Sequence, residues 1–459
     1  MLISSNTGHQ TNLLGTDLLL QLDPKDPLLQ LARVISWSTL ENAFAKHYCQ
    51  NLGRPAKPIR LMSGLLILKQ LENLSDDKVV LECKRNPYYQ AFCGLTEFSN
   101  KPPCDSSELT QFRKRIGIEG VELLFKLSVQ LHGNAALEET LNIDTTVQEK
   151  NITYPTDGKL AIKMINRLNK IAKAYGIHQR RTYGKEVKSL RLNLRHFRHV
   201  KRRTKAKKAL KRLRTIAFTQ IRELRRTLPC YALFEQYQKD FLFYERILNQ
   251  KKDDHHKIYS LHEPDVYCIG KGKDHKPYEY GNKVSIAATA KSNIIVGVVS
   301  HPKNLHDSKT LSDVLAHCEN SRGKGVTAGV CDRGYRGPKK IGETRIILPA
   351  PPLKRDNRYQ QNKKRRRCQR RAAIEPIIGH LKSDFRLSRN FLKGVKGDHI
   401  NLLMAAVAWN FSLWMRPFFA SILHINLNVF ELKRFGIFLL IEHKVADVQT
   451  TLNRFDILV

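Results

Sequence analysis

Two stretches of strand-like alternation, separated by a long basic helical region, constrain the fold of this chain more than any other feature. Apolar or β-branched residues take every second position of LNIDTTVQ, residues 141–148, as in a half-buried strand. The pattern returns only at NKVSIAATA and NIIVGVVSHP, residues 282–290 and 293–302, which predict a hairpin. Asp157 to about Lys257 has helical spacing instead. We therefore predict an α/β sheet domain interrupted by a basic helical insertion.

The chain before the first strand, from Leu28 to about Leu131, has apolar residues at helical spacing. Asp105 and Glu108 in DSSELTQFRKRIG resemble a capping box, and Gly117 is expected to end that helix. Its apolar face leaves a polar face that is expected to point outward and could read DNA, formed by Gln111, Arg113, Lys114 and Arg115. The alternative is an ordinary amphipathic helix with a solvated basic face.

The charge of the chain indicates a polyanionic partner. Its 459 residues hold 79 Lys and Arg against 42 Asp and Glu, a formal net charge of +37. Residues 157–226 hold 24 Lys and Arg and 3 acids, and KRRRCQRR at 364–371 is a second basic block. A single basic run is usually a solvated face, but two such blocks favour binding to double-stranded DNA.

Cysteine spacing and hydropathy narrow the class of protein. The 9 cysteines are widely spread, with no C-x-x-C pair and no H-E-x-x-H, so neither a disulfide framework nor a zinc site is expected. The longest uncharged apolar run, about 400–415, is too short and too polar to span a bilayer, and no signal-peptide pattern precedes the helices. We expect a soluble cytoplasmic protein without membrane contacts.

The second half of the chain alternates helices and strands. A helix is expected from about Ser308 to Cys318, with Asp307 as its N-cap. A strand should end in VTAGVCDRGYRG, and a short one should follow in RIILPAP. A basic loop is then expected to lead into RRAAIEPIIGHLKSDF, residues 370–385.

Three carboxylates on these elements could support metal-assisted phosphodiester chemistry, which uses hard oxygen ligands to hold two Mg²⁺ ions. Asp144 lies on the polar side of the first strand, and Asp332 follows an apolar strand and precedes a glycine-rich loop. Glu375 supplies the third carboxylate from a helix. The alternatives are a turn-forming role for Asp332 and a helix-surface pair for Glu375 and Lys382.

The helix that carries Glu375 also places two cations. Pro376 is tolerated only in a first turn, so the helix should begin near Ala373. Lys382 then lies two turns on and within about 20° of Glu375. Arg371, four residues before Glu375, approaches the same side if the helix extends that far. The carboxylate could bind metal while both cations bind DNA phosphates.

The sequences around these residues resemble a known family. The stretches IDTTVQEKNITYPTDGKL, VCDRGYRG and RRAAIEPIIGHLKSDFRLSRNFLKG are similar to the three catalytic blocks of bacterial insertion-sequence DDE transposases, in the family named after insertion sequence five. The amino-terminal GRPAKPIRLMSGLLILKQLENLSDDKVV resembles the helical domain that precedes those blocks. Within the signature Y-x2-R-x3-E-x6-K, Arg371, Glu375 and Lys382 match, but Cys368 replaces the tyrosine.

The resemblance implies a fold and a domain order. It implies a ribonuclease H-like catalytic core whose metal ligands are Asp144, Asp332 and Glu375. An all-α DNA-binding domain is expected at residues 1–135, before a catalytic domain at 136–423. The helical insertion should occupy about 157–258, and the tail at 424–459 matches nothing familiar.

The resemblance also implies an activity. A DDE transposase cleaves DNA at the terminal inverted repeats of its element and joins the freed ends to target DNA, using two Mg²⁺ ions, for which Mn²⁺ substitutes. We expect a homodimer in the DNA complex and an association with the bacterial nucleoid. Two alternatives stay open: a ribonuclease H-like nuclease that cuts without joining, and a catalytically dead or domesticated DNA-binding protein.

Overall fold

The computed structural model divides into two compact units. One unit comprises Met1–Leu137 and Met404–Val459, and the other comprises Glu138–Leu403. The structure describes residues 17–49, 55–197, 199–251, 253–270, 276–337 and 339–422, so the tail set apart in the sequence, 424–459, lies outside it.

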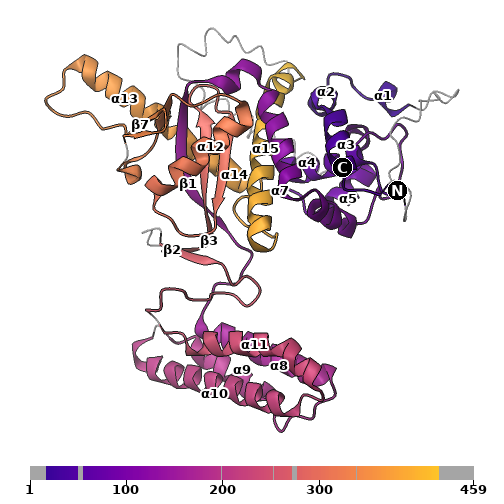
Figure 1. Cartoon of the computed structure of the whole chain (residues 1–459), viewed down its shortest axis with the longest axis vertical. Helices are drawn as coiled ribbons and strands as arrows, with labels where there is room; N and C mark the ends of the chain where they lie inside the picture. The colour runs from indigo at the N-terminus through magenta and orange to yellow at the C-terminus, as the bar shows by residue number, and fades with distance from the viewer. Residues whose placement is uncertain are drawn as a thin grey trace, which may run out of the picture. The chain divides into compact units, whose positions relative to one another are not determined.

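The first unit is helical, as the spacing of apolar residues predicts (Figure 1). Local capping explains where several helices begin: Asp26, Ser75 and Asn86 each accept a hydrogen bond from the backbone of the following turn. The helices before Cys93 are α1 (Leu18–Gln21), α2 (Pro27–Val34), α3 (Trp37–Ala45), α4 (Ile59–Leu71), α5 (Asp76–Arg85) and α6 (Pro87–Phe92).

Helix α7 (Ser106–Gln130) confirms two predictions about its ends. The Asp105 carboxylate accepts from the backbone of the first turn, and the Glu108 side chain accepts from the Asp105 N–H, which makes a complete capping box. Gly117 has φ of 64° and ψ of −159°, so it breaks the helix into two segments. A residue with a Cβ would be strained there.

The second unit contains a mixed seven-stranded sheet. The strand order is β2-β3-β1-β5-β7-β6, and β4 also pairs with β3. β1 is antiparallel to β3 and parallel to β5, while β3 and β4 form the predicted antiparallel hairpin. The strands are β1 (Thr140–Glu149), β2 (Tyr267–Gly270), β3 (Tyr278–Thr289), β4 (Ile295–His301), β5 (Ala328–Val330), β6 (Lys340–Ile341) and β7 (Thr344–Ile347).

Helices cover both faces of this sheet. Gly297 on β4 lies against Cys318 of α12 (Leu311–Arg322), and the register Gly297–Ala287–Ile143 places Ile143 on that face. Asn142 and Asp144 therefore point to the opposite face, where α14 (Ile374–Ser383) packs on β1. Alternation along β1 thus separates the polar candidates from the apolar core beneath α12.

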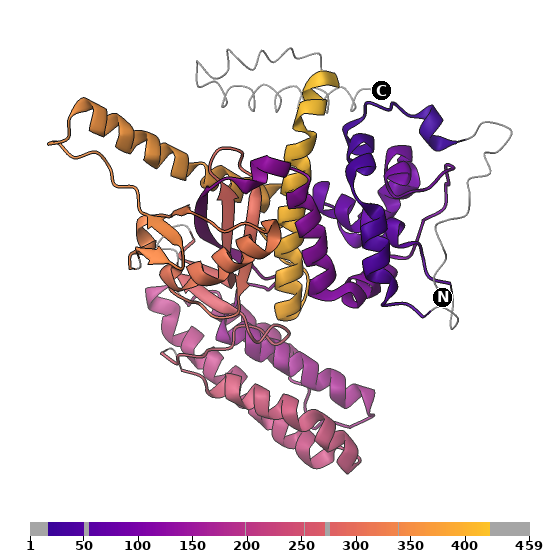
Figure 2. The same cartoon turned by 45° about the horizontal axis from the view of Figure 1, so that its top comes forward.

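Four helices follow β1 and precede β2, and they share a hydrophobic core of their own (Figure 2). Amphipathic spacing places Leu168, Leu213, Phe241 and Tyr244 in this core, each fully buried, while lysines and arginines lie on the outer surface. The helices are α8 (Asp157–Ala174), α9 (Gly184–Leu194), α10 (Arg203–Thr227) and α11 (Tyr231–Asn249).

One sequence prediction about this unit is wrong. The stretch before Glu375 is not a basic loop but a helix, α13 (Arg358–Ala372), which begins with a capping box formed by Asn357 and Gln360. Of its described side chains none is buried, so no apolar periodicity could indicate it. Arginine, lysine and glutamine are nevertheless good helix formers.

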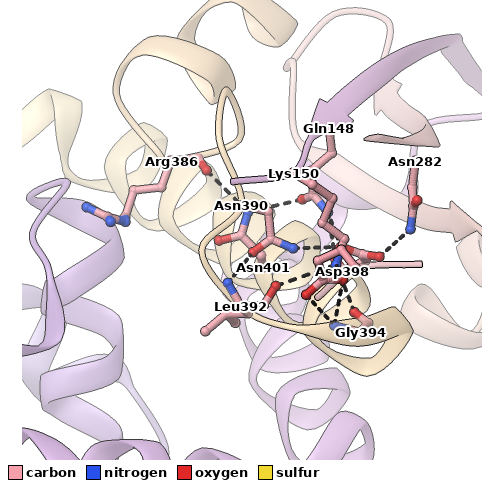
Figure 3. A network of polar contacts seen from close by, with 10 residues as sticks. Gln148, Lys150, Asn282, Arg386, Asn390, Leu392, Gly394, Asp398 and Asn401 are labelled. Carbon is pink, nitrogen blue, oxygen red and sulfur yellow. Dashed lines mark hydrogen bonds and ion pairs between the residues drawn. The ribbon is translucent and has the colours of Figure 1, made fainter. Parts of the chain in front are cut away.

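A buried polar network joins the end of β1 to the segments around it (Figure 3). The Lys150 ammonium, with a side chain 3% exposed, lies 2.6 Å from Asp398 and 3.1 Å from Glu263. Asn282 on β3 and Asn390 also donate to Asp398, which lies in α15 (Gly394–Ile422). Burial raises the pKa of Asp398 to about 6, while Lys150 opposes that rise.

None of the helices in the described ranges is both long and apolar enough to cross a bilayer.

We predict that Lys150→Met destabilises the protein by about 3–5 kcal/mol, because it leaves the carboxylates of Glu263 and Asp398 buried without their shared cation. Urea unfolding followed by circular dichroism measures the change. The matched control is Lys340→Met, whose ion pair with Glu343 is exposed, and a change within about 0.5 kcal/mol is expected there. Equal effects of the two substitutions would contradict the prediction.

Candidate functional site

Two of the three predicted carboxylates come from neighbouring parallel strands, Asp144 within β1 and Asp332 just after the end of β5. β1 and β5 pair with Asn142 level with Val330. Asp144 and Asp332 each follow two residues later, so continuing the register places them side by side where β5 ends. Asp144 is held by β1 within the sheet, whereas Asp332 is the first polar residue of the loop after β5.

The loop at Asp332 is shaped by the carboxylate itself. Asp332 caps the 3₁₀ turn Arg333–Tyr335 and accepts a hydrogen bond of 2.7 Å from the Gly334 N–H. The turn-forming role and the proposed ligand role are compatible, because a carboxylate has further lone pairs after accepting one backbone hydrogen bond. The strand-end location predicted from the sequence is confirmed.

Arg371 joins the third carboxylate to the sheet. It lies in the last turn of α13, and its guanidinium is 3.2 Å from Glu375 Oε1 and 3.5 Å from Asp144 Oδ2. The contact to Asp144 spans 227 residues of sequence. A strand residue and a helix residue are therefore brought together by one cation, which pairs with each of them.

The electrostatics of Asp144 reflect this crowding of negative charge. The pKa of Asp144 is raised to about 6, mainly by burial and in smaller part by the charges of Asp332 and Glu375. The hydrogen bond from the Thr145 N–H and the positive charge of Arg371 act in the opposite direction. The carboxylates are thus close enough to repel one another, and Arg371 compensates only part of their charge.

This set of donors fits hard divalent cations. Carboxylate oxygens are the preferred protein ligands of Mg²⁺, and a cation would relieve the repulsion that raises the pKa of Asp144. Among the described residues, no three or more His, Cys, Asp and Glu side chains enclose a single metal position.

Lys382 lies on the same helix as Glu375, as predicted. Both belong to α14, whose start at Ile374 agrees with the start expected from Pro376. Lys382 is half-buried and Glu375 is exposed. The helix thus presents a carboxylate in its first turn and an ammonium in its last turn.

The predicted capping role of Asp307 is wrong. His306 caps the turn that begins at Asp307, and the Asp307 carboxylate instead accepts hydrogen bonds of 2.9 Å from both Thr145 and Lys283. A Cβ on Gly334 would lie 3.0 Å from Asp332 Oδ1 and 3.3 Å from Asp307 Oδ2. Asp307 is therefore a fourth acid beside the predicted set.

Sequence reasoning also missed the residues that surround this acid. Lys283 lies on β3 next to β1, and Tyr335 is fully buried below the Asp332 loop. Burial raises the pKa of Tyr335, and the charge of Asp144 raises it further, so its hydroxyl stays protonated. The sequence offered one signal for this environment, because strand alternation places Thr145 and Lys283 on the same face of the sheet. That signal does not show which loop covers the face.

Comparison with known proteins places the chain in a family. A family model described as a transposase domain matches residues 17–115, and one described as a transposase DDE domain matches residues 254–411. An uncharacterized protein, ORF8 in the nfe locus of Rhizobium meliloti, is 41% identical over 185 residues, covering 39% of this chain and 89% of the relative. The chain belongs to the DDE transposases. No solved structure matches it significantly.

The two matched ranges contain most of the candidate site residues, but not all of them. Asp332, Arg371, Glu375 and Lys382 lie within the DDE domain match, whereas Asp144 lies between the two matched ranges. The structure places Asp144 next to the residues of the DDE domain match, because Arg371 contacts both Asp144 and Glu375.

The helix with the predicted DNA-reading face needs one correction. Gln111, Lys114 and Arg115 are exposed as expected, but Arg113 is only 5% exposed and does not point outward. Its guanidinium donates two hydrogen bonds, of 3.1 and 2.7 Å, to the carboxylate of Asp76 on α5. Arg113 therefore joins α7 to α5, because a buried guanidinium needs an acidic partner within hydrogen-bond distance.

This pair predicts how stability depends on pH. Burial alone would raise the pKa of Asp76, but the hydrogen bond from Arg113 and the charges of Lys69 and Arg113 lower it to about 2. A carboxyl group whose pKa is lowered in the folded state stabilises the fold at any pH above its unfolded-state pKa, which is about 4. This contribution is lost as the pH falls from about 4 towards 2. We expect Arg113→Met to lower the melting temperature at pH 7 and to reduce this acid-dependent loss. Thermal unfolding of both proteins at pH 2 to 7 tests this, and identical pH profiles would contradict it.

Proposed function

We propose that this transposase cleaves DNA at the ends of an insertion sequence and joins the freed ends to target DNA. The catalytic core would be ribonuclease H-like, with Asp144, Asp332 and Glu375 as its acidic set. The ion contacts of Arg371 carry the proposal, because they bring a strand residue and a helix residue into one charged cluster.

The acidic set would hold two Mg²⁺ ions, for which Mn²⁺ would substitute. Bound divalent ions of this kind activate the attacking oxygen and stabilise the leaving oxygen of an in-line displacement. Asp144 is central to the set, since it follows the part of β1 that pairs with β5, just before Asp332, and it shares Arg371 with Glu375. The three carboxylates would together hold the ions, and Arg371 would balance part of their charge.

In the first step, a water oxygen attacks the phosphorus of the phosphodiester at the element's end. A new P–O bond forms, the bond between phosphorus and the 3′ oxygen breaks, and the leaving oxygen takes a proton to become a free 3′-hydroxyl. Arg371 and Lys382 would bind the nonbridging phosphate oxygens and hold the phosphorus in line with the attacking oxygen. Release of Arg371 from Asp144 would free its guanidinium for this contact.

In the second step, the freed 3′-hydroxyl attacks a phosphodiester of the target strand. One phosphodiester forms and one breaks, so the step needs no external energy source. The same carboxylates and cations would serve, because both steps are in-line displacements at phosphorus. A nuclease that cuts without joining would stop after the first step.

DNA binding would extend well beyond the acidic cluster. The net charge of +37 and the exposed cations of α10 and α13 suit phosphate contacts along a duplex. We propose that the helical region at 1–135 recognises the terminal repeats, that the domain at 136–423 performs the chemistry, and that the helices at about 157–258 form a basic insertion within it. Two copies would act together in the DNA complex.

We predict that Asp144→Asn, Asp332→Asn and Glu375→Gln each reduce Mg²⁺-dependent cleavage by more than about a hundredfold. Each change removes one anionic ligand but keeps the shape of the side chain, so DNA binding should persist. The losses should not add in double variants, because the ligands act as a unit. The measurement is nicking and joining of supercoiled DNA that carries the sequences flanking the reading frame, with binding followed by gel shift.

The matched control is Glu343→Gln, because Glu343 is an almost fully exposed acid between β6 and β7. Asp307 is not suitable as a control, since it lies beside the acidic set. Full cleavage by Glu375→Gln, or an equal loss in Glu343→Gln, would show that the wrong acids have been assigned. Cleavage without joined products would support the nuclease alternative, and binding without cleavage by the unaltered protein would support a dead or domesticated one.

A further prediction concerns recognition of the element's ends. Replacing the exposed Gln111 and Lys114 by alanine should lower affinity for end DNA more than affinity for a random duplex, because these side chains are free to reach base edges. If Lys114 neutralises one phosphate, log affinity of the double variant should depend less steeply on log salt, with a slope smaller in magnitude by about 0.9. Lys46→Ala, at another exposed cation of the same unit, should affect both duplexes equally. An unchanged ratio of affinities in the double variant would refute this role.

A further inference from the structure

The carboxylate of Asp307 has no part in the proposed mechanism, yet it is held in a fixed position beside the acidic set. Its Oδ1 accepts hydrogen bonds of 2.9 Å from the Thr145 hydroxyl and from the Lys283 ammonium. Lys283 also donates a 2.6 Å hydrogen bond to the carbonyl oxygen of Leu305, two residues before Asp307. Side chains from two neighbouring strands, β1 and β3, therefore bind the segment that carries Asp307 to the sheet.

Asp332 depends on such an anchor more than Asp144 does. The backbone at Asp144 lies within the ladder between β1 and β3, directly opposite Ile286. Asp332 instead lies in the loop after the three-residue strand β5. Because a loop beyond the end of a short strand takes its position from the groups it packs against, the neighbours of this loop determine where the Asp332 carboxylate lies. The turn at Arg333–Tyr335 packs on the turn at Asp307–Thr310.

Gly334 is the residue at which these two turns meet. A Cβ on Gly334 would lie 3.0 Å from Asp332 Oδ1 and 3.3 Å from Asp307 Oδ2, so the glycine fills the space between the two carboxylates. Its N–H donates a 2.7 Å hydrogen bond to Asp332 Oδ1. A displacement of Asp307 would therefore change the space available to Gly334 and, through the N–H of this glycine, the position of the Asp332 carboxylate.

The charge of Asp307 is already balanced, which argues against a role as a further metal ligand. Lys283, with a side chain 14% exposed, forms an ion pair with it. The two hydrogen bonds to Oδ1 occupy the lone pairs of that oxygen, and Oδ2 faces Gly334. Thr145 and Lys283 lie on the face of the sheet opposite to Asp144, because successive residues of a strand alternate. Asp307 therefore contacts the sheet on the face away from Asp144.

We propose that Asp307 is a positioning residue that sets the separation of Asp332 from Asp144, and that this separation makes the acidic set selective for Mg²⁺. Mg²⁺ is small and requires near-ideal octahedral coordination, whereas larger divalent cations accept less regular arrangements of oxygen ligands. A shift of Asp332 should therefore weaken the binding of Mg²⁺ more than the binding of Mn²⁺, which is the larger ion. This inference rests on the proposed function.

The test compares full-length Asp307→Ala protein with the unaltered protein in two measurements. The first is Mn²⁺ binding without DNA, followed by the electron paramagnetic resonance signal of free Mn²⁺, with Mg²⁺ added as a competitor. The Mg²⁺ dissociation constant should rise about tenfold, as is typical when a residue that orients metal ligands is lost, and the Mn²⁺ constant should rise less than about threefold. The second is end cleavage at subsaturating metal, in which the ratio of the Mg²⁺ rate to the Mn²⁺ rate should fall by a similar factor.

Three further variants separate positioning from other roles. Asp307→Asn keeps Oδ1 and both of its hydrogen bonds but removes the charge, so it should preserve the selectivity for Mg²⁺ that Asp307→Ala loses. Thr145→Val removes only the hydroxyl that donates to Asp307, and it should raise the Mg²⁺ constant about threefold. Glu319→Ala, at an exposed acid of α12, is the matched control and should change neither constant.

The outcomes that overturn the inference are distinct from those that overturn the proposed function. Equal losses in Asp307→Asn and Asp307→Ala would mean that the negative charge of Asp307 acts directly, as that of a metal ligand does. Equal weakening of Mg²⁺ and Mn²⁺ in Asp307→Ala and in Thr145→Val would mean a general loss of structure at the site. Either result rejects a positioning role that confers selectivity. Absence of both Mn²⁺ binding and cleavage in the unaltered protein would instead refute the proposed function.

Discussion

The ammonium group of Lys150, buried between two carboxylates, is the interaction on which the arrangement of the sheet unit depends. Removing such a group from water costs several kcal/mol, and the cost is offset only when partners surround it. Asp398, Glu263 and two backbone carbonyls do so here. Because these partners come from α15 and from the segments before β2 and after α14, folding must bring all of them to the end of β1 at once.

The buried ion pairs of Lys150 fix the end of β1, and the same strand carries Asp144 of the acidic cluster. β1 is paired with β3 over nearly its full length, so its position at Lys150 also determines where Asp144 lies, six residues earlier. The two clusters have opposite charge balance. At Lys150 one cation is shared by two buried acids, whereas at Asp144 three acids and one arginine leave an excess of negative charge. In a chain with a net charge of +37, this local excess of negative charge would suit the bound cations of the proposed function.

The sequence predicts those parts of the fold whose signals are local. The strand at 141–148, the hairpin and the cap at Asp105 each depend on side-chain alternation or on one turn of backbone, and all are present. Helix α13 was missed because it has no buried face to produce a period. Arg113 was predicted to point outward because periodicity does not reveal a partner on another helix. Asp307 was predicted to be an N-cap because its actual partners lie on strands that are distant in sequence.

Helix α13 connects DNA binding to the geometry of the acidic cluster. Its cations Lys363, Arg366, Arg367, Arg370 and Arg371 repeat at spacings of three and four, and like charges at these spacings destabilise an isolated helix. The capping box at Asn357 and the ion pair between Lys364 and Asp356 offset part of that repulsion. Phosphates bound along the helix would remove much of the rest. Bound DNA would then stabilise the helix whose last turn carries Arg371 beside the acidic cluster, so that substrate binding and the ordering of α13 would reinforce each other.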